Sequence, residues 1–274
     1  MALILVRGAG DVGSAVAHVL SCAGHRVILH DVPKPAHPRR GMSFTDALFS
    51  GAKELEGVHA VHARTLADLW RVLEPGRAIP VVDMGLQAVV EAVKPDGVVD
   101  ARMQKHRLPG KERVLAPLTV GLGPGFVAGE NANVAIETAW GERLGAVILS
   151  GSTSAQAGEP RELGGHGRDR YRCAPVSGRF ETSLGIGDHV EPGDAVASVG
   201  DAILVAPLAG RLRGLVHDGA RVDAGAKVIE VDPRDDRSLV FGLGERPRRI
   251  AEGVLQAVDA GSAPVDRPSN DALR

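Results

Sequence analysis

The first 31 residues contain a strand, a glycine-rich loop, a helix, a second strand and an acid, in that order. The apolar run Ala2–Val6 predicts a buried parallel strand and leads directly into Gly8-Ala9-Gly10-Asp11-Val12-Gly13. Ser14–Leu20 has the apolar spacing of a helix, and Arg26–His30 predicts a second strand that ends at Asp31. The complete order is typical of a nucleotide-binding βαβ unit.

Each glycine of this loop has a predicted role. Gly8 would allow the tight turn out of the strand, Gly10 would let a phosphate approach the backbone, and Gly13 would let helix and strand pack closely. Asp31 would accept hydrogen bonds from a ribose diol. Two alternatives are a Rossmann-like loop that binds no nucleotide and a loop that binds a different phosphate ligand. Asp11 favours these alternatives, because its carboxylate would repel a pyrophosphate unless the side chain points away from the loop.

Predicted strands and helices alternate through the first part of the chain. The predicted elements are a helix at 44–49, a strand at 58–61, a helix at 66–72, a strand at 79–82, a helix at 88–93, and strands at 97–99 and 147–149. This alternation predicts an α/β fold, a Rossmann-like doubly wound parallel sheet, over residues 1–150. Ligands of such sheets bind beyond the carboxyl ends of the strands.

Three acids, Asp31, Asp83 and Asp100, each directly follow a predicted strand. They could contact a ligand or cap the next helix. Asp100 leads into a loop with several positive groups, which includes Lys105, and shows no helix-cap pattern. A second glycine turn, Gly121–Gly125, contains Gly123 and Gly125 and could be either a structural turn or an anion site.

The last third contains an internal repeat. Ala174-Pro175-Val176-Ser177-Gly178-Arg179 recurs as Ala206-Pro207-Leu208-Ala209-Gly210-Arg211, an offset of 32 residues. The pattern resembles the barrel-sandwich (lipoyl/biotinyl-like) domain, with two halves that should intertwine. No lysine occurs between Ala174 and Ala206, so biotin and lipoate are excluded as cofactors.

The predicted domain organisation follows from these patterns. Residues 1–150 form the Rossmann-like domain, 151–168 a linker or flap, and 169–234 a small all-β barrel-sandwich module. Residues 235–260 form a C-terminal strand and helix, and 261–274 a disordered tail.

Composition excludes several classes of protein. The formal net charge is −2, and no apolar run approaches the roughly 20 residues that span a bilayer, so neither nucleic acid nor membrane is an expected partner. The two cysteines are far apart in sequence, and no signal peptide is visible, so the expected location is cytoplasmic.

Known catalytic and metal motifs do not fit the chain either. There is no HExxH, paired CxxC or GxSxG pattern, and no lysine lies four residues beyond the single tyrosine, Tyr171. His59 and His62 lie in a predicted strand and should face opposite sides, so no metal site is predicted. Catalytic residues stay unknown at this stage.

Several segments together resemble a known family. They are Gly8–Asp11, Asp100-Ala101 with Lys105, the Gly-Leu-Gly-Pro-Gly-Phe run at 121–126, Ala174-Pro175-x-x-Gly178 and Asp232-Pro233-Arg234. On these segments the chain resembles the accessory proteins of selenium-dependent molybdenum hydroxylases. That family is related to xanthine dehydrogenase accessory proteins, which have a Rossmann-like domain.

The resemblance implies a role in maturation of a molybdenum hydroxylase. The cofactor would be molybdopterin or a nucleotide such as NAD, and the partners would be the hydroxylase apoenzyme and a sulfur or selenium donor protein. Homo-oligomerisation is also compatible with this role. Arg39 and Arg40 would bind phosphate, and Asp100 with Lys105 would hold the pterin edge.

Two alternatives stay open: an NAD-dependent oxidoreductase and a non-catalytic nucleotide-binding scaffold. The predicted cofactor site consists of Gly8, Gly10, Asp11, Gly13, Asp31, Arg39, Arg40, Asp100, Lys105, Gly123 and Gly125.

Overall fold

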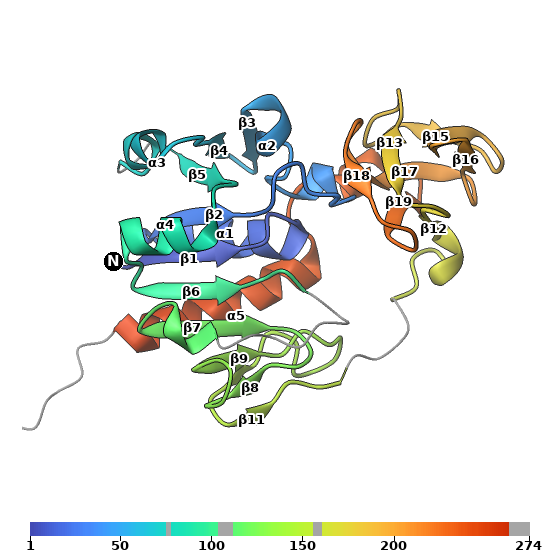
Figure 1. The fold of residues 1–274 in the computed structure, drawn as a ribbon. Coiled ribbons are helices and arrows are strands. Elements are labelled where there is room, and N and C mark those ends of the chain that lie inside the picture. Colours follow the sequence, from blue (N-terminus) through green and yellow to red (C-terminus); the bar gives the residue numbers. More distant parts are fainter. Residues whose placement is uncertain (75–77, 104–111, 156–160, 263–274) are drawn as a thin grey trace, which may run out of the picture.

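The structure, a computed structural model, describes residues 1–74, 78–103, 112–155 and 161–262. Its largest element is a nine-stranded sheet in the order β10-β9-β7-β6-β1-β2-β5-β4-β3 (Figure 1). These strands are β1 (Leu3–Arg7), β2 (Arg26–His30), β3 (Ala52–Leu55), β4 (Val58–His62), β5 (Ile79–Val82), β6 (Gly97–Asp100), β7 (Leu118–Leu122), β9 (Val134–Ile136) and β10 (Val147–Ile148). A separate pair joins β8 (Val127–Ala128) to β11 (Gly151–Ser152).

Helices cover both faces of the large sheet (Figure 1). They are α1 (Asp11–Cys22), α2 (Ala47–Ser50), α3 (Leu66–Val72), α4 (Leu86–Val93) and α5 (Glu245–Ser262), with short 3-10 turns η1 (Arg40–Met42), η2 (Glu112–Val114), η3 (Arg168–Arg170) and η4 (Arg237–Val240). Among the helices in the described ranges, none is long and apolar enough to cross a membrane.

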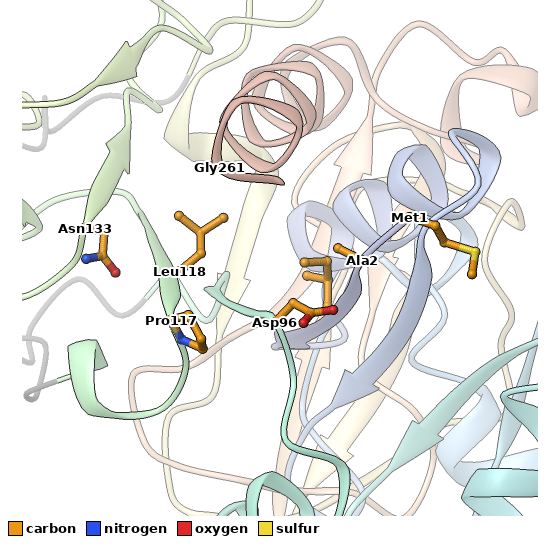
Figure 2. A pocket seen from close by; sticks show the side chains of 8 residues that line it. Met1, Ala2, Asp96, Pro117, Leu118, Asn133 and Gly261 are labelled. Carbon is orange, nitrogen blue, oxygen red and sulfur yellow. The ribbon is translucent and has the colours of Figure 1, made fainter. Parts of the chain in front are cut away.

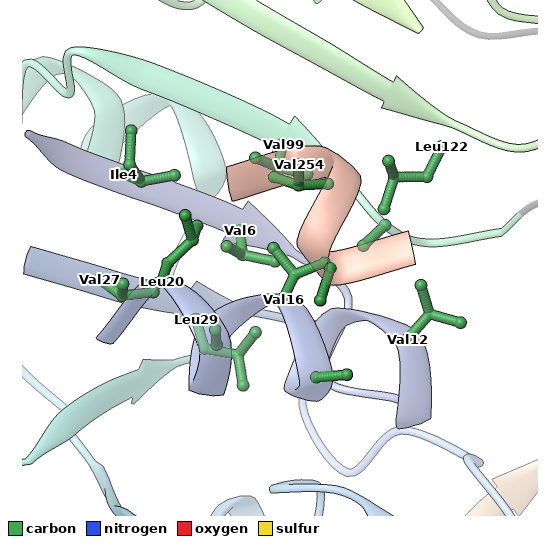
Figure 3. Packing of buried hydrophobic residues seen from close by; sticks show 14 of the residues in the cluster. Ile4, Val6, Val12, Val16, Leu20, Val27, Leu29, Val99, Leu122 and Val254 are labelled. Atoms are coloured by element: carbon green, nitrogen blue, oxygen red, sulfur yellow. The ribbon is translucent and has the colours of Figure 1, made fainter. Parts of the chain in front are cut away.

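Alternation along β1 divides the apolar core into two layers. Ile4 and Val6 face α1 and α5, where they pack with Val16 and Val254 (Figure 3). Leu5 belongs to the opposite layer, against α3 and α4. Successive strand residues point to opposite faces, so one short apolar strand supports helices on both sides of the sheet.

The predicted fold class is wrong, because the protein has a mixed α/β fold with a large, mostly parallel sheet rather than a Rossmann-like doubly wound parallel sheet. The edge strands break the parallel pattern: β3 pairs antiparallel with β4, and β10 pairs antiparallel with β9. At one edge, Glu56 and Gly57 both have positive φ, 46° and 80°, as a two-residue hairpin turn requires. Neither this turn nor β3 was predicted from the sequence.

The last third forms two four-stranded sheets, β12-β19-β17-β14 and β16-β15-β13-β18. Their strands are β12 (Tyr171–Cys173), β13 (Gly178–Glu181), β14 (His189–Val190), β15 (Ala195–Val199), β16 (Ala202–Val205), β17 (Gly210–Leu215), β18 (Arg221–Val222) and β19 (Lys227–Asp232). The two repeat halves exchange strands: β14 of the first half pairs with β17, and β18 of the second half pairs with β13. Phe180, Leu212 and Val228 lie in the apolar core between these strands.

A separate barrel-sandwich module, the second part of the predicted fold class, is also not supported. The last third is bonded directly to the α/β part, because Leu215 N donates to Pro38 O at 2.8 Å. Arg40 in turn donates to Leu215 O at 3.4 Å. The domain boundaries proposed from the sequence stay predictions, and the predicted tail lies outside the described residues beyond Ser262.

The turn from β1 to α1 depends on glycine for steric reasons within the fold. A Cβ on Gly13 would lie 1.7 Å from Gly8 O, far inside any real contact. Gly8 has φ +105°, and a Cβ there would lie 3.0 Å from Ala101 O. The close helix–strand packing predicted for Gly13 is therefore confirmed.

We expect Gly13→Ala to destabilise the protein by about 3 kcal/mol or more, because the new methyl group overpacks against backbone that cannot move freely. Gly85→Ala is the matched control, since Gly85 has negative φ and a Cβ added to it would meet no atom within 4 Å. In urea unfolding, the free energy of unfolding of Gly85→Ala should lie within about 1 kcal/mol of the wild-type value. Equal effects of the two changes would contradict this account of the turn.

Candidate functional site

The glycine loop lies at the carboxyl end of β1, and its backbone is bonded to Asp31. Ala9 N donates to Asp31 Oδ2 at 2.5 Å, and Val32 N donates to Oδ1 at 2.7 Å. His37 Nε2 also lies 2.7 Å from Asp31 Oδ2. The carboxylate predicted to accept bonds from a ribose therefore already has three partners within the chain.

His37 covers the position at which a phosphate would approach the loop. A Cβ on Gly10 would lie 3.2 Å from the His37 ring, so the imidazole occupies the space above Gly10. Burial lowers the pKa of His37, but the hydrogen bond and charge of Asp31 outweigh burial and raise that pKa above its ordinary value. A nucleotide at this loop stays a prediction, and its binding would require the His37 ring to move.

Arg39 connects the glycine loop to the last third of the chain. Its Nη1 lies 2.8 Å from Asp11 Oδ2, at the first turn of α1. Its Nε and Nη2 lie 2.8 and 3.1 Å from the two carboxylate oxygens of Glu230 in β19. The predicted phosphate-binding guanidinium is thus held between two carboxylates.

Glu230 is fully buried and is the centre of an arginine cluster. Besides Arg39 it contacts Arg170, and Arg213 Nε lies 3.6 Å from its Oε1. Burial favours the protonated carboxyl, but the charge and hydrogen bonds of Arg39, followed by the charges of Arg170 and Arg213, outweigh burial and lower the pKa of Glu230 to about 2. This cluster could not be predicted from local sequence patterns, because 191 residues separate Arg39 from Glu230.

The other predicted charged residues that the structure describes, Arg40 and Asp100, also have partners within the chain. Arg40 pairs with Asp46 at 2.7 Å, and Asp100 pairs with Arg102 at 2.5 Å and with Arg7 at 3.4 Å. The loop after Asp100 does approach the second glycine turn: a Cβ on Gly123 would lie 3.4 Å from the Met103 side chain. Gly125 O accepts a hydrogen bond from Asn131, and Lys105 lies outside the described residues.

A cavity of about 600 Å³ lies where the carboxyl ends of β2, β4 and β5 meet the last third of the chain. We call it the junction cleft and define it by the residues that matter chemically. These are the cations Lys34, Arg64 and Arg221, the pair His62 and Asp83, and the ring of Phe49. Phe49 stacks on His217, with ring centroids 3.9 Å apart, and so joins α2 to the segment before β18.

Three segments that are separate in sequence bring the cations together. Lys34 lies between Pro33 and Pro35 in the loop after β2, Arg64 follows β4, and Arg221 begins β18. All three side chains are exposed. Within the described ranges, none of these side chains has a hydrogen bond or an ion pair, in contrast to Arg39 and Arg40.

Among the described residues of the junction cleft, His62 and Asp83 are the only two side chains that form a hydrogen-bonded pair with each other. His62 Nε2 lies 3.1 Å from Asp83 Oδ1, and their side chains are 7% and 23% exposed. As predicted, His59 faces away: its side chain is 62% exposed and lies near Glu54. In the described part of the chain no three His, Cys, Asp or Glu side chains group as metal ligands.

A second cavity, of about 470 Å³, lies at the amino ends of β1, β6 and β7 and is lined by Asp96, Asn133 and Gly261, among others (Figure 2). Asp96 is the only charged side chain among its described lining residues. Its Oδ2 accepts a hydrogen bond from Leu3 N at 2.7 Å. This cavity therefore offers a ligand much less free charge than the junction cleft does.

Comparison with known proteins identifies a long curated relative without an assigned function. The chain is 38% identical over 256 residues to "Uncharacterized protein YqeB" of Escherichia coli (strain K12). The match covers 93% of this chain and 47% of the relative, so the chain spans about half the length of the curated relative it matches. No protein-family profile matches the chain.

Two of the solved structures that the chain resembles are distant matches. A succinylglutamate desuccinylase from Silicibacter sp. is 16% identical, with 84% of each chain covered and a TM-score of 0.24. A succinylglutamate desuccinylase/aspartoacylase from Rhodobacter sphaeroides is 16% identical, with 84% of this chain and 85% of the other covered and a TM-score of 0.25. At these scores no conclusion about this chain's activity follows.

The predicted family and function are wrong. The curated relative is uncharacterised, and the solved structures named above are of the desuccinylase/aspartoacylase group, not xanthine dehydrogenase-type accessory proteins. The predicted role in maturation of a molybdenum hydroxylase depended on this resemblance and is therefore wrong as well. The structure supplies a physical reason, because Arg39, Arg40 and Asp100, which were assigned to cofactor phosphate and pterin, are already paired with oppositely charged side chains of the chain itself.

We expect Glu230→Gln to destabilise the protein by about 3–5 kcal/mol at pH 7, since three arginines lose a buried counter-charge. The pKa of Glu230 is lowered in the folded state from 4.5 to about 2, so its stabilisation is present above pH 4.5 and is lost as the pH falls towards 2. Urea unfolding from pH 7 to pH 3 should show the two proteins converging.

The control for this series is Glu181→Gln. Glu181 is 59% exposed and pairs with Arg179 at the surface, where a single ion pair contributes little. The free energy of unfolding of the Glu181→Gln variant should stay within about 0.5 kcal/mol of the wild-type value. A Glu230→Gln effect that is equally small, or that does not change with pH, would contradict the buried-cluster account.

Proposed function

We propose that this chain binds a small molecule with two negative charges, such as a phosphate monoester, in the junction cleft. One observation carries the proposal: three exposed cations from three separate segments line one cavity, and none of them forms an ion pair in the described structure. Bringing like charges together costs free energy unless an anion neutralises them. Asp83 balances one of the three positive charges, which leaves two for a ligand.

The types of side chain favour phosphate over an apolar ligand. Arginine presents a planar set of donors that matches phosphate or carboxylate oxygens, and lysine adds a compact point charge. Arg64 and Arg221 come from the α/β part and from the last third respectively, so a bound phosphate would contact both parts. The cleft also lies at the carboxyl ends of parallel strands, where α/β proteins commonly bind ligands.

Phe49 and Leu48 supply an apolar wall to the same cavity. A ligand there would place its charged end among the cations and its uncharged part against this wall. Binding sites for small molecules commonly combine apolar lining with a few placed polar groups. These properties support binding of a small organic phosphate better than of a bare inorganic ion.

We expect glycerol 3-phosphate to bind the wild-type protein at low salt, measured by isothermal titration calorimetry. Each of Lys34→Gln, Arg64→Gln and Arg221→Gln should weaken binding about three- to tenfold, at the lower end of charge-assisted bonds because all three side chains are exposed. The triple variant should show no binding. High salt should weaken binding to wild type as well, since screening shortens the range of these charges.

Arg71→Gln is the matched control, because Arg71 pairs with Asp68 on α3 and does not line the cleft. This variant should bind glycerol 3-phosphate as tightly as wild type. Unchanged affinity in the triple variant, or no binding to wild type at millimolar ligand, would overturn the proposed function.

A further inference from the structure

The carboxylate of Asp83 is unexpected in a cleft that is otherwise cationic. It is the one acidic side chain among the described lining residues. Its Oδ1 lies beside His62 Nε2, whereas its Oδ2 has no hydrogen bond or ion pair in the described structure. An ionised carboxylate can accept about four hydrogen bonds, so Asp83 keeps free acceptor capacity at the wall of the cavity.

His62 fixes the orientation of this carboxylate. Its Nδ1 is buried and has no hydrogen-bond partner among the described residues. A proton on Nδ1 would therefore be a buried donor without an acceptor, and the bare Nε2 would face the carboxylate. The favoured neutral tautomer carries its proton on Nε2 and donates it to Asp83 Oδ1, which makes His62 a positioning residue.

A fixed carboxylate discriminates among anionic ligands. It repels an anion that has no hydrogen-bond donor near it, and it accepts a hydrogen bond from an anion that carries a hydroxyl group. A ligand ammonium group could also donate to Asp83. However, it would cancel part of the ligand's negative charge, and the excess positive charge of the cleft favours a ligand that keeps that negative charge. A hydroxyl group meets both requirements.

Resting on the proposed function, we infer that the junction cleft selects hydroxylated phosphate monoesters, of the sugar-phosphate class, through a hydrogen bond from a ligand hydroxyl to Asp83 Oδ2. The phosphate lies among Lys34, Arg64 and Arg221, and the hydroxyl lies against Asp83. His62 acts through Asp83 and makes no direct contact with the ligand.

The test compares glycerol 3-phosphate with propyl phosphate, which has the same chain length and charge but no hydroxyl group. Wild type should bind glycerol 3-phosphate roughly tenfold or more tightly, the ratio expected for a hydrogen bond to a charged group. In Asp83→Ala this ratio should fall to about one, and propyl phosphate should bind more tightly than it binds wild type. Thermal melts in the absence of ligand check that the variant is folded.

Two further variants test the positioning role of His62. His62→Phe should lower the ratio, because Asp83 loses the donor that orients it. His62→Gln should largely retain the ratio, because its side-chain amide can donate to Asp83 in the same way. Equal loss in both variants would overturn the positioning role.

The outcomes separate the two proposals. Binding of both phosphates to wild type with equal affinity overturns this inference and leaves the proposed function standing. Binding of neither phosphate overturns both. A ratio that survives Asp83→Ala overturns the assignment of the hydroxyl contact to Asp83.

Discussion

The guanidinium of Arg39 holds the two parts of this molecule together. It lies between Asp11, at the start of α1, and the buried Glu230, in β19 of the last third of the chain. A buried carboxylate among arginines is costly to desolvate, and only good geometry with several partners offsets that cost. These two ion pairs therefore fix the position of the loop that contains Arg39 relative to α1 and β19.

That loop has consequences on both of its sides. It begins at Asp31, which is bonded to the glycine loop, and it ends at Arg39. Between these ends, His37 lies over Gly10, and Lys34 has a left-handed conformation, φ 48°, at the wall of the junction cleft. The same connection thus covers the predicted nucleotide loop and shapes the open cavity beside it.

Local patterns in the sequence predict much of the α/β part. The strand at Arg26–His30, the helix at Leu66–Val72 and the strand at Ile79–Val82 are predicted with the observed bounds, because apolar spacing and flanking turns are local signals. The edge strand β3 is missed, because its hairpin depends on an unusual turn at Glu56-Gly57 rather than on a glycine pair.

The candidate site is far less accessible to sequence analysis. The glycine spacing at Gly8, Gly10 and Gly13 predicts a ligand loop, but packing against Ala101, His37 and the loop's own backbone already accounts for each glycine. Asp83 stands at a predicted strand end, yet its bond to His62 and its proximity to Arg221 arise from tertiary structure. No local pattern relates residues that far apart.

In the proposed function, the exposed cations Lys34, Arg64 and Arg221 bind the ligand in the junction cleft, and the glycine loop does not bind it. A crystal structure of the protein grown with glycerol 3-phosphate locates the ligand directly. The account predicts phosphate density among Lys34, Arg64 and Arg221, with the His37 ring still over Gly10. Phosphate density at the glycine loop with His37 displaced, and an empty junction cleft, would contradict it.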